Sequence, residues 1–127
     1  MTRMGKPGNT GIKRVIRATR FSAQGFAHAW RHEAAFRQEL GGSLVLTPIA
    51  LLLGTSVYER LLLVACLLLV LIVELLNSAV EAAIDRVGDE HHELSGRAKD
   101  LGSAAVFVSL ALTLLAWAAV AWKRFSG

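Results

Sequence analysis

The sequence predicts an all-α integral membrane protein with three transmembrane helices and an N-terminal amphipathic surface helix. Its composition favours this fold, because 54% of the 127 residues are hydrophobic and only 19% are charged, which is too apolar for an ordinary soluble chain. In addition, the apolar residues form long segments, and the polar residues beside them recur at helical spacing. The length suits a single domain over residues 1–127.

The N-terminal part predicts a helix on the membrane surface. Residues 1–11 are rich in Gly, Pro and Asn, and we expect them to be flexible. Over residues 12–38 the apolar Ile12 and Ile16 can share one helix face, while Arg17 lies on another. A helix with one apolar and one basic face lies in the interface between lipid and water.

Three apolar segments follow and predict transmembrane helices. They are residues 40–58, 61–85 and 102–123. The first contains Pro48 and Gly54, and it spans a bilayer only if its polar flanks are drawn in. The third ends with Trp117 and Trp122, which suit an aromatic belt at the membrane surface. The single cysteine, Cys66, lies in the second segment, so no intramolecular disulfide can form.

The basic residues predict the orientation of the chain. Eight of the fourteen Lys and Arg residues lie within the first 37 residues. With three spans, Arg86, Arg97 and Lys99 fall on the same side as these eight, and three basic residues fall on the other. The positive-inside rule then places the N-terminus and the loop between the second and third spans in the cytoplasm. The basic N-terminal region suits anionic lipid headgroups, and nucleic acid is not an expected partner.

Four polar residues follow the apolar run of the second span. Glu74, Asn77, Glu81 and Asp85 are spaced by 3, 4 and 4 residues, so they lie on one face of a helix, here called the polar stripe. At about 1.5 Å per residue from Leu61, Glu74 lies about 20 Å into a hydrocarbon layer about 30 Å thick. Glu81 reaches the cytoplasmic boundary of that layer.

The polar stripe favours chemistry on a substrate dissolved in the membrane. A carboxylate in hydrocarbon costs about 2.5 kcal/mol or more, so an intramembrane acid indicates a functional site. Glu74 suits a general base acting on an alcohol, and carboxylates at the water boundary suit Mg²⁺ held together with phosphates. This is the arrangement that phosphate transfer to a lipid hydroxyl needs. The structural alternative is an interhelical hydrogen bond from a protonated Glu74, with Asn77 as a second polar contact.

Residues outside the stripe each allow two interpretations. Glu90, His91, His92 and Glu93 could form a metal cluster, but adjacent histidines without other strong ligands are more typical of a solvated loop. Lys99 could reach a phosphate, or it could simply follow the positive-inside rule. Glu33 could be a ligand, or it could pair with the arginine four positions later on the helix surface.

Two familiar site motifs are incomplete in this sequence. The segment HEAAF, residues 32–36, begins like the zinc motif H-E-x-x-H, but Phe36 stands at the position of the second histidine. Gly5 and Lys6 are followed by Pro7 with no room upstream for a phosphate loop, so a Walker A nucleotide site is excluded. ATP would therefore bind through another scaffold.

Three segments together resemble a known family. They are EAAFRQE at residues 33–39, ELLNSAVEAAID at 74–85 and DEHHELSGRAKD at 89–100. The sequence closely resembles the bacterial integral-membrane diacylglycerol kinases from about Arg14 to the third span. The resemblance implies a homotrimeric helical bundle in the bacterial inner membrane, with active sites shared between subunits. It also implies phosphoryl transfer from ATP with Mg²⁺ to the hydroxyl of diacylglycerol, giving phosphatidic acid and ADP.

The resemblance also implies roles for individual residues. Glu74 would be the catalytic base, and Glu33 and Glu81 would bind Mg²⁺. The positions that would bind the nucleotide are Arg14, Asn77, Glu90, His91, His92, Lys99 and Asp100. The positions that would contact the lipid substrate are Arg14, Glu74 and Ser103, and those that would support the active site are Asp85 and Glu39.

Two other functions remain as alternatives. The related undecaprenol kinases of Gram-positive bacteria share the scaffold, although HELSGRA at residues 92–98 is more similar to the diacylglycerol enzymes. A small oligomeric transporter could use Glu74 as a proton-coupled site, but this leaves the carboxylates at the water boundary unexplained.

The sequence departs from the family pattern at two positions. Phe21 and His91 stand where the family carries Tyr, so contacts with adenine would differ.

Overall fold

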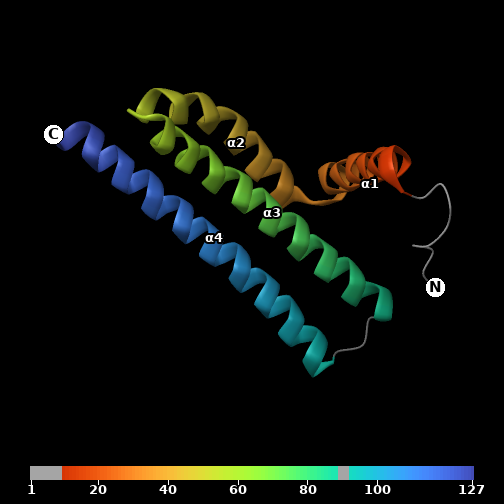
Figure 1. Ribbon diagram of the computed structural model, residues 1–127. Coiled ribbons are helices and arrows are strands. Elements are labelled where there is room, and N and C mark those ends of the chain that lie inside the picture. The colour runs from red at the N-terminus through yellow and green to blue at the C-terminus, as the bar shows by residue number, and fades with distance from the viewer. Residues whose placement is uncertain (1–9, 89–91) are drawn as a thin grey trace. The chain divides into compact units, whose positions relative to one another are not determined.

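The computed structural model describes residues 10–88 and 92–127, and within them the chain is helical without a strand. The helices are α1 (Gly11–His32), α2 (Ala34–Leu53), α3 (Val57–Val87) and α4 (Glu93–Ser126) (Figure 1). The chain divides into two compact units, Met1–Glu33 and Ala34–Gly127. The single domain stays a prediction. The all-helical prediction is confirmed for the described residues.

The single helix predicted over residues 12–38 is divided in two at Glu33. The backbone of Glu33 is extended, with φ −118° and ψ 104°, and its N–H donates to the carbonyl oxygen of Ala29 at 2.9 Å. Residues from Ala34 onward belong to α2 and to the second unit. The segment has no Gly or Pro at this point, so the sequence carries no helix-breaking signal that would mark the division.

Helix α1 exposes its apolar face. Ile12 is 75% exposed, and Val15, Ile16 and Trp30 are each more than half exposed. A basic helix with an uncovered apolar face is typical of segments that lie in a membrane interface. The interfacial position of α1 stays a prediction.

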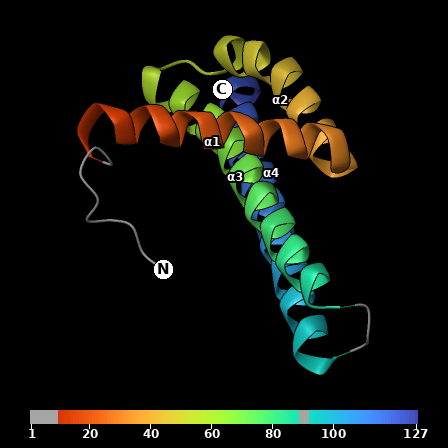
Figure 2. The same ribbon diagram turned by 90° about the vertical axis from the view of Figure 1, so that its right-hand side faces the viewer.

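The second unit is an antiparallel arrangement of three helices. Helix α3 packs along α4 over the largest interface, α2 packs on α3, and α2 and α4 contact each other little. Figures 1 and 2 show that α3 and α4 continue side by side beyond the N-terminal end of α2. Ala50, Leu63 and Val120 form a buried cluster with one residue from each helix. Among the described residues of this unit, the C-terminal end of α3 and the N-terminal end of α4 therefore pack only against each other.

Two helices are long and apolar enough to cross a membrane by length and composition. They are α3, with 31 residues, and α4, with 34 residues. Most of their apolar side chains are exposed in the single chain, as expected for helices that face lipid. Among the described residues α2 does not meet this criterion, and it ends at Leu53 although a span is predicted over 40–58. The span predicted over residues 40–58 therefore stays a prediction.

The turn between α2 and α3 explains why the predicted segment 40–58 is interrupted. Ser56 caps α3 by accepting a hydrogen bond from the N–H of Glu59 at 3.1 Å. The Glu59 carboxylate accepts hydrogen bonds from the N–H and the hydroxyl of Thr55, both at 2.9 Å. Ser followed three residues later by Glu is the sequence pattern of a helix N-terminus, and a new helix begins here.

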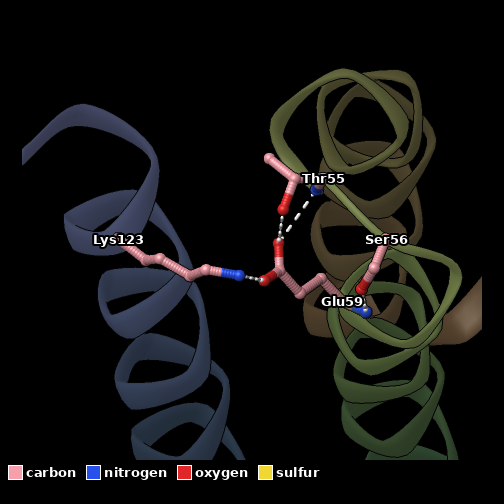
Figure 3. A network of polar contacts seen from close by, with 4 residues as sticks. All are labelled: Thr55, Ser56, Glu59 and Lys123. Atoms are coloured by element: carbon pink, nitrogen blue, oxygen red, sulfur yellow. Dashed lines mark hydrogen bonds and ion pairs between the residues drawn. The ribbon is translucent and has the colours of Figure 1, made fainter. Parts of the chain in front are cut away.

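Lys123, near the C-terminal end of α4, connects α4 to this turn. Its ammonium group donates to the second carboxylate oxygen of Glu59 (Figure 3). Two segments distant in sequence, the turn before α3 and the end of α4, therefore meet at Glu59. We call Thr55, Glu59 and Lys123 the turn clamp. The clamp lies at the end of α3 opposite to the polar stripe, so it holds the helices together far from the candidate site.

Polar contacts also tie α3 to α4 within their apolar interface. The hydroxyl of Thr113 lies 2.8 Å from the carbonyl oxygen of Ser109 and 3.3 Å from that of Cys66. The indole N–H of Trp117 donates to the carbonyl oxygen of Leu63 at 3.3 Å. The Trp117 side chain also packs against the buried cluster of Ala50, Leu63 and Val120. Trp117 therefore contributes to helix packing, whereas Trp122 is 75% exposed. The aromatic belt stays a prediction for both residues.

Candidate active site

The candidate site centres on a pair of carboxyl groups, one from α2 and one from α3. Glu74 is only 4% exposed, and it is the only buried charged residue in the described part of the chain. Its carboxyl group is hydrogen-bonded to that of Glu39. A hydrogen bond between two carboxyl groups requires a proton on one of them, because an ionised carboxylate only accepts. Helix α2 therefore places a second acid directly against the predicted base.

Three buried oxygens near this pair make no hydrogen bond within the described residues. They are Oε1 of Glu39, Oδ1 of Asn77 and Oγ of Ser78. Asn77 and Ser78 follow Glu74 by about one helical turn, and Glu39 contacts Glu74, so the three atoms share one region. Buried polar atoms normally have hydrogen-bond partners, so these three oxygens remain able to accept hydrogen bonds from a bound group. Ser78 was not predicted, although it belongs to the same motif as Asn77.

Gly102 of α4 lies directly against Asn77. A Cβ atom placed on Gly102 would lie 2.2 Å from Oδ1 of Asn77 and 3.2 Å from its Cγ. Oδ1 of Asn77 therefore lies in the space that a side chain at Gly102 would need. The collision would be with the side chain of Asn77, since the nearest backbone atom of α3, the Cα of Asn77, would lie 3.9 Å away.

The remaining residues of the stripe lie further along α3. Glu81 is half-buried and Asp85 is exposed. Oδ1 of Asp85 accepts a hydrogen bond from the ammonium group of Lys99 at 3.0 Å, which links the ends of α3 and α4. The two side chains are 68% and 45% exposed, so the ion pair adds at most about 1 kcal/mol to stability. Its main effect is to hold Lys99 close to the stripe.

The N-terminal part of α4 carries other predicted site residues. His92 caps the helix, because its Nδ1 accepts a hydrogen bond from the N–H of Leu94 at 3.0 Å. Asp100 and Ser103 are exposed on the same helix. Glu90 and His91 lie outside the described residues.

Two predicted site residues belong to the first unit. Arg14 is exposed on α1, and Glu33 is half-buried at the end of that unit. No group of three or more His, Cys, Asp or Glu side chains that could hold a metal ion occurs within residues 10–88 and 92–127. Carboxylates such as Glu33 and Glu81 are nevertheless the hard oxygen ligands that Mg²⁺ takes in small numbers beside phosphates and water.

Comparison with known proteins shows which family the chain is similar to. The family model of prokaryotic diacylglycerol kinase matches residues 20–121. The diacylglycerol kinase of Pseudomonas aeruginosa (strain PAO1) is 54% identical over 113 residues, which cover 89% of this chain and 92% of that protein.

Two other relatives match a similar share of the chain. The diacylglycerol kinase of Escherichia coli (strain K12) is 47% identical over 116 residues, covering 91% of this chain and 95% of that protein. That of Helicobacter pylori (strain 26695) is 38% identical over 111 residues, covering 87% of each chain. The matched range contains Glu33, the polar stripe and Lys99. This chain therefore belongs to the prokaryotic diacylglycerol kinase family.

Proposed function

We propose that this chain phosphorylates diacylglycerol in the membrane, using ATP and giving phosphatidic acid and ADP. The carboxyl pair of Glu39 and Glu74 carries this proposal, because it is buried within a helix apolar enough to span a bilayer. An acid within an apolar, membrane-spanning helix suits a substrate hydroxyl that is dissolved in the lipid. Membership of the kinase family supports the same reaction.

The chemical step needs a base and a means of neutralising charge. The hydroxyl oxygen of diacylglycerol attacks the γ-phosphorus of ATP, the bond from that phosphorus to the β–γ bridging oxygen breaks, and ADP leaves. The hydroxyl proton passes to the carboxylate of Glu74, which acts as general base. The carboxyl groups of Glu39 and Glu74 share one proton and together still bear one negative charge. The pair can therefore accept the proton from the lipid hydroxyl.

The phosphates require cations at the water boundary. Glu33 and Glu81 would hold Mg²⁺, which neutralises the negative charge of the ATP phosphates during transfer. Lys99, held by Asp85, adds a positive charge near the stripe. The other nucleotide contacts are assigned to Arg14, Asn77, Glu90, His91, His92 and Asp100, and the lipid contacts are assigned to Arg14, Glu74 and Ser103.

We also propose the setting of the reaction. The protein is a homotrimer in the inner membrane with shared active sites, and α2 supplies the third span. The exposed apolar faces of α3 and α4 support contacts with lipid or with other copies of the chain. The concentration of basic residues in the N-terminal region supports a cytoplasmic N-terminus and active site.

The decisive experiment is phosphate transfer from γ-labelled ATP by the purified protein in mixed micelles. One sample of micelles contains diacylglycerol and the other contains undecaprenol, and Mg²⁺ is present in both. We expect labelled phosphatidic acid as the main product, and no label in the Glu74→Gln variant at unchanged helix content. Label on undecaprenol alone would change the lipid substrate, and label on neither lipid in folded protein would favour a transporter. Full activity in Glu74→Gln would remove Glu74 from the role of base.

The metal assignment is tested by titration with Mg²⁺. Glu81→Gln should need a higher Mg²⁺ concentration for half-maximal rate, because one carboxylate ligand is lost. Glu93→Gln is the matched control, since Glu93 is exposed on α4 and contacts only Arg97 among the ion pairs of the described residues, at 3.4 Å. A normal Mg²⁺ response in Glu81→Gln would exclude Glu81 as a ligand.

A further inference from the structure

Gly102 differs from the other glycines of the helices that surround the candidate site. A Cβ atom added to Gly96 of α4, or to Gly41 and Gly42 of α2, would meet no atom within 4 Å. A Cβ atom added to Gly102 would lie 2.2 Å from Oδ1 and 3.9 Å from Cα of Asn77. The backbone of α4 at Gly102 thus forms the surface against which the carboxamide of Asn77 rests.

This contact is what fixes the carboxamide of Asn77 on its Oδ1 side. Oδ1 is buried and makes no hydrogen bond within the described residues, so shape and not hydrogen bonding limits its position. Asn77 lies one helical turn beyond Glu74, the proposed base. We propose that Gly102 is a positioning residue of the kinase site, which keeps the Asn77 carboxamide in place for the nucleotide because it has no side chain. The inference rests on the proposed nucleotide role of Asn77.

A methyl group at Gly102 would displace Asn77 without requiring the helices to separate. The colliding atom is the end of a rotatable side chain, so the carboxamide can swing away while the backbone of α3 stays in place. Gly102→Ala should therefore fold and yet present Asn77 in a different orientation. A change of about 1 Å in the position of a binding group is enough to weaken binding strongly.

The position of Asn77 can be observed directly. The sequence has two asparagines, Asn9 and Asn77, so protein labelled with ¹⁵N only in asparagine side chains gives two carboxamide signals. The Asn77→Ala variant identifies the signal of Asn77 by its loss. Gly102→Ala should shift that signal and leave the signal of Asn9 unchanged, whereas the control Gly96→Ala should shift neither. An unshifted Asn77 signal in Gly102→Ala would overturn the proposal.

Activity provides the second measurement, as a double-mutant cycle. Gly102→Ala should raise the KM for ATP at least about tenfold, with a smaller effect on the KM for diacylglycerol. In an Asn77→Ala background the same change should alter the KM for ATP less than about twofold, because the group that Gly102 positions is gone. Equal effects in both backgrounds would overturn the proposal.

The same variants separate this proposal from the proposed function. If Asn77→Ala keeps a normal KM for ATP, the nucleotide role of Asn77 is wrong, and the carboxamide signal still tests its contact with Gly102. If Gly102→Ala alone fails to fold, the double variant with Asn77→Ala should fold again, because the collision is removed. Failure of the double variant to fold would show that Gly102 serves helix packing, and this would overturn the positioning role.

Discussion

Lys99 of α4 donates a hydrogen bond to Asp85 of α3 at 3.0 Å. The pair joins the ends of two helices that no other helix of their unit holds together at this level. Both side chains remain largely exposed, so their attraction is screened by water and adds little to stability. The pair is therefore better suited to holding the Lys99 charge near the polar stripe than to stabilising the fold.

Asp85→Asn should reduce activity more than stability. Without its ion-pair partner the ammonium group of Lys99 is no longer held near α3, so we expect the KM for ATP to rise about tenfold. The unfolding free energy should change by less than about 1 kcal/mol. Steady-state kinetics and thermal unfolding in the same detergent measure both quantities. Wild-type kinetics in Asp85→Asn would contradict a role for this pair in the reaction.

Removing the acid next to the proposed base should reduce kcat. Glu39→Ala leaves the carboxyl group of Glu74 without the hydrogen bond from α2, and we expect kcat to fall on the order of a hundredfold. Glu39→Gln can still hydrogen-bond to Glu74 and should retain more activity. The KM for ATP should change less than about twofold in both variants, because Glu39 acts through Glu74. A rise in that KM with unchanged kcat would show that Glu39 contacts the nucleotide instead.

The turn clamp predicts a pH-dependent contribution to stability. Helix α3 is longer than the roughly 20 residues that cross a bilayer, and Glu59 lies in its first turn before the apolar run that begins at Leu61. The hydrogen bond from Lys123, and those from Thr55, lower the pKa of Glu59 from 4.5 to about 2. A carboxyl group with a lowered pKa stabilises the folded state above its unfolded pKa, and this contribution is lost as the pH falls towards the folded value.

Glu59→Gln should therefore unfold at a lower temperature than the wild type at pH 7. The difference between the two unfolding temperatures should persist down to about pH 4.5 and shrink between about pH 4.5 and 2. Thermal unfolding followed by circular dichroism in detergent measures it, with Glu93→Gln as the control for loss of an exposed carboxylate. A difference that stays constant throughout this range would mean that Glu59 acts by packing and not by charge.

The two tryptophans near the end of α4 should differ in their effect on stability. Trp117→Phe removes the hydrogen bond to the carbonyl oxygen of Leu63 and should cost about 0.5–1.5 kcal/mol. Trp122→Phe should change stability little in detergent, because this side chain is 75% exposed. Denaturant unfolding in micelles compares the two variants. Equal losses would indicate that the indole N–H of Trp117 does not stabilise the helix pair.

The helical class and most of the polar stripe could be predicted because both depend on local patterns. A run of apolar residues from Leu61 to Val73 predicts that α3 enters the membrane, and the spacing of the four stripe residues sets their common face. The division of the chain at Glu33 was not predictable in this way, because extended backbone at one residue without Gly or Pro leaves no mark in the sequence.

The sequence by itself determined an apolar helical chain with acids on one helix face, since hydropathy and helical periodicity are properties of neighbouring residues. Only the tertiary structure decided which residues meet. It brings Glu39 to Glu74, Lys99 to Asp85 and Gly102 to Asn77, all from different helices. These contacts depend on where each helix begins and on how closely two backbones approach, and both are set by packing between segments distant in the chain.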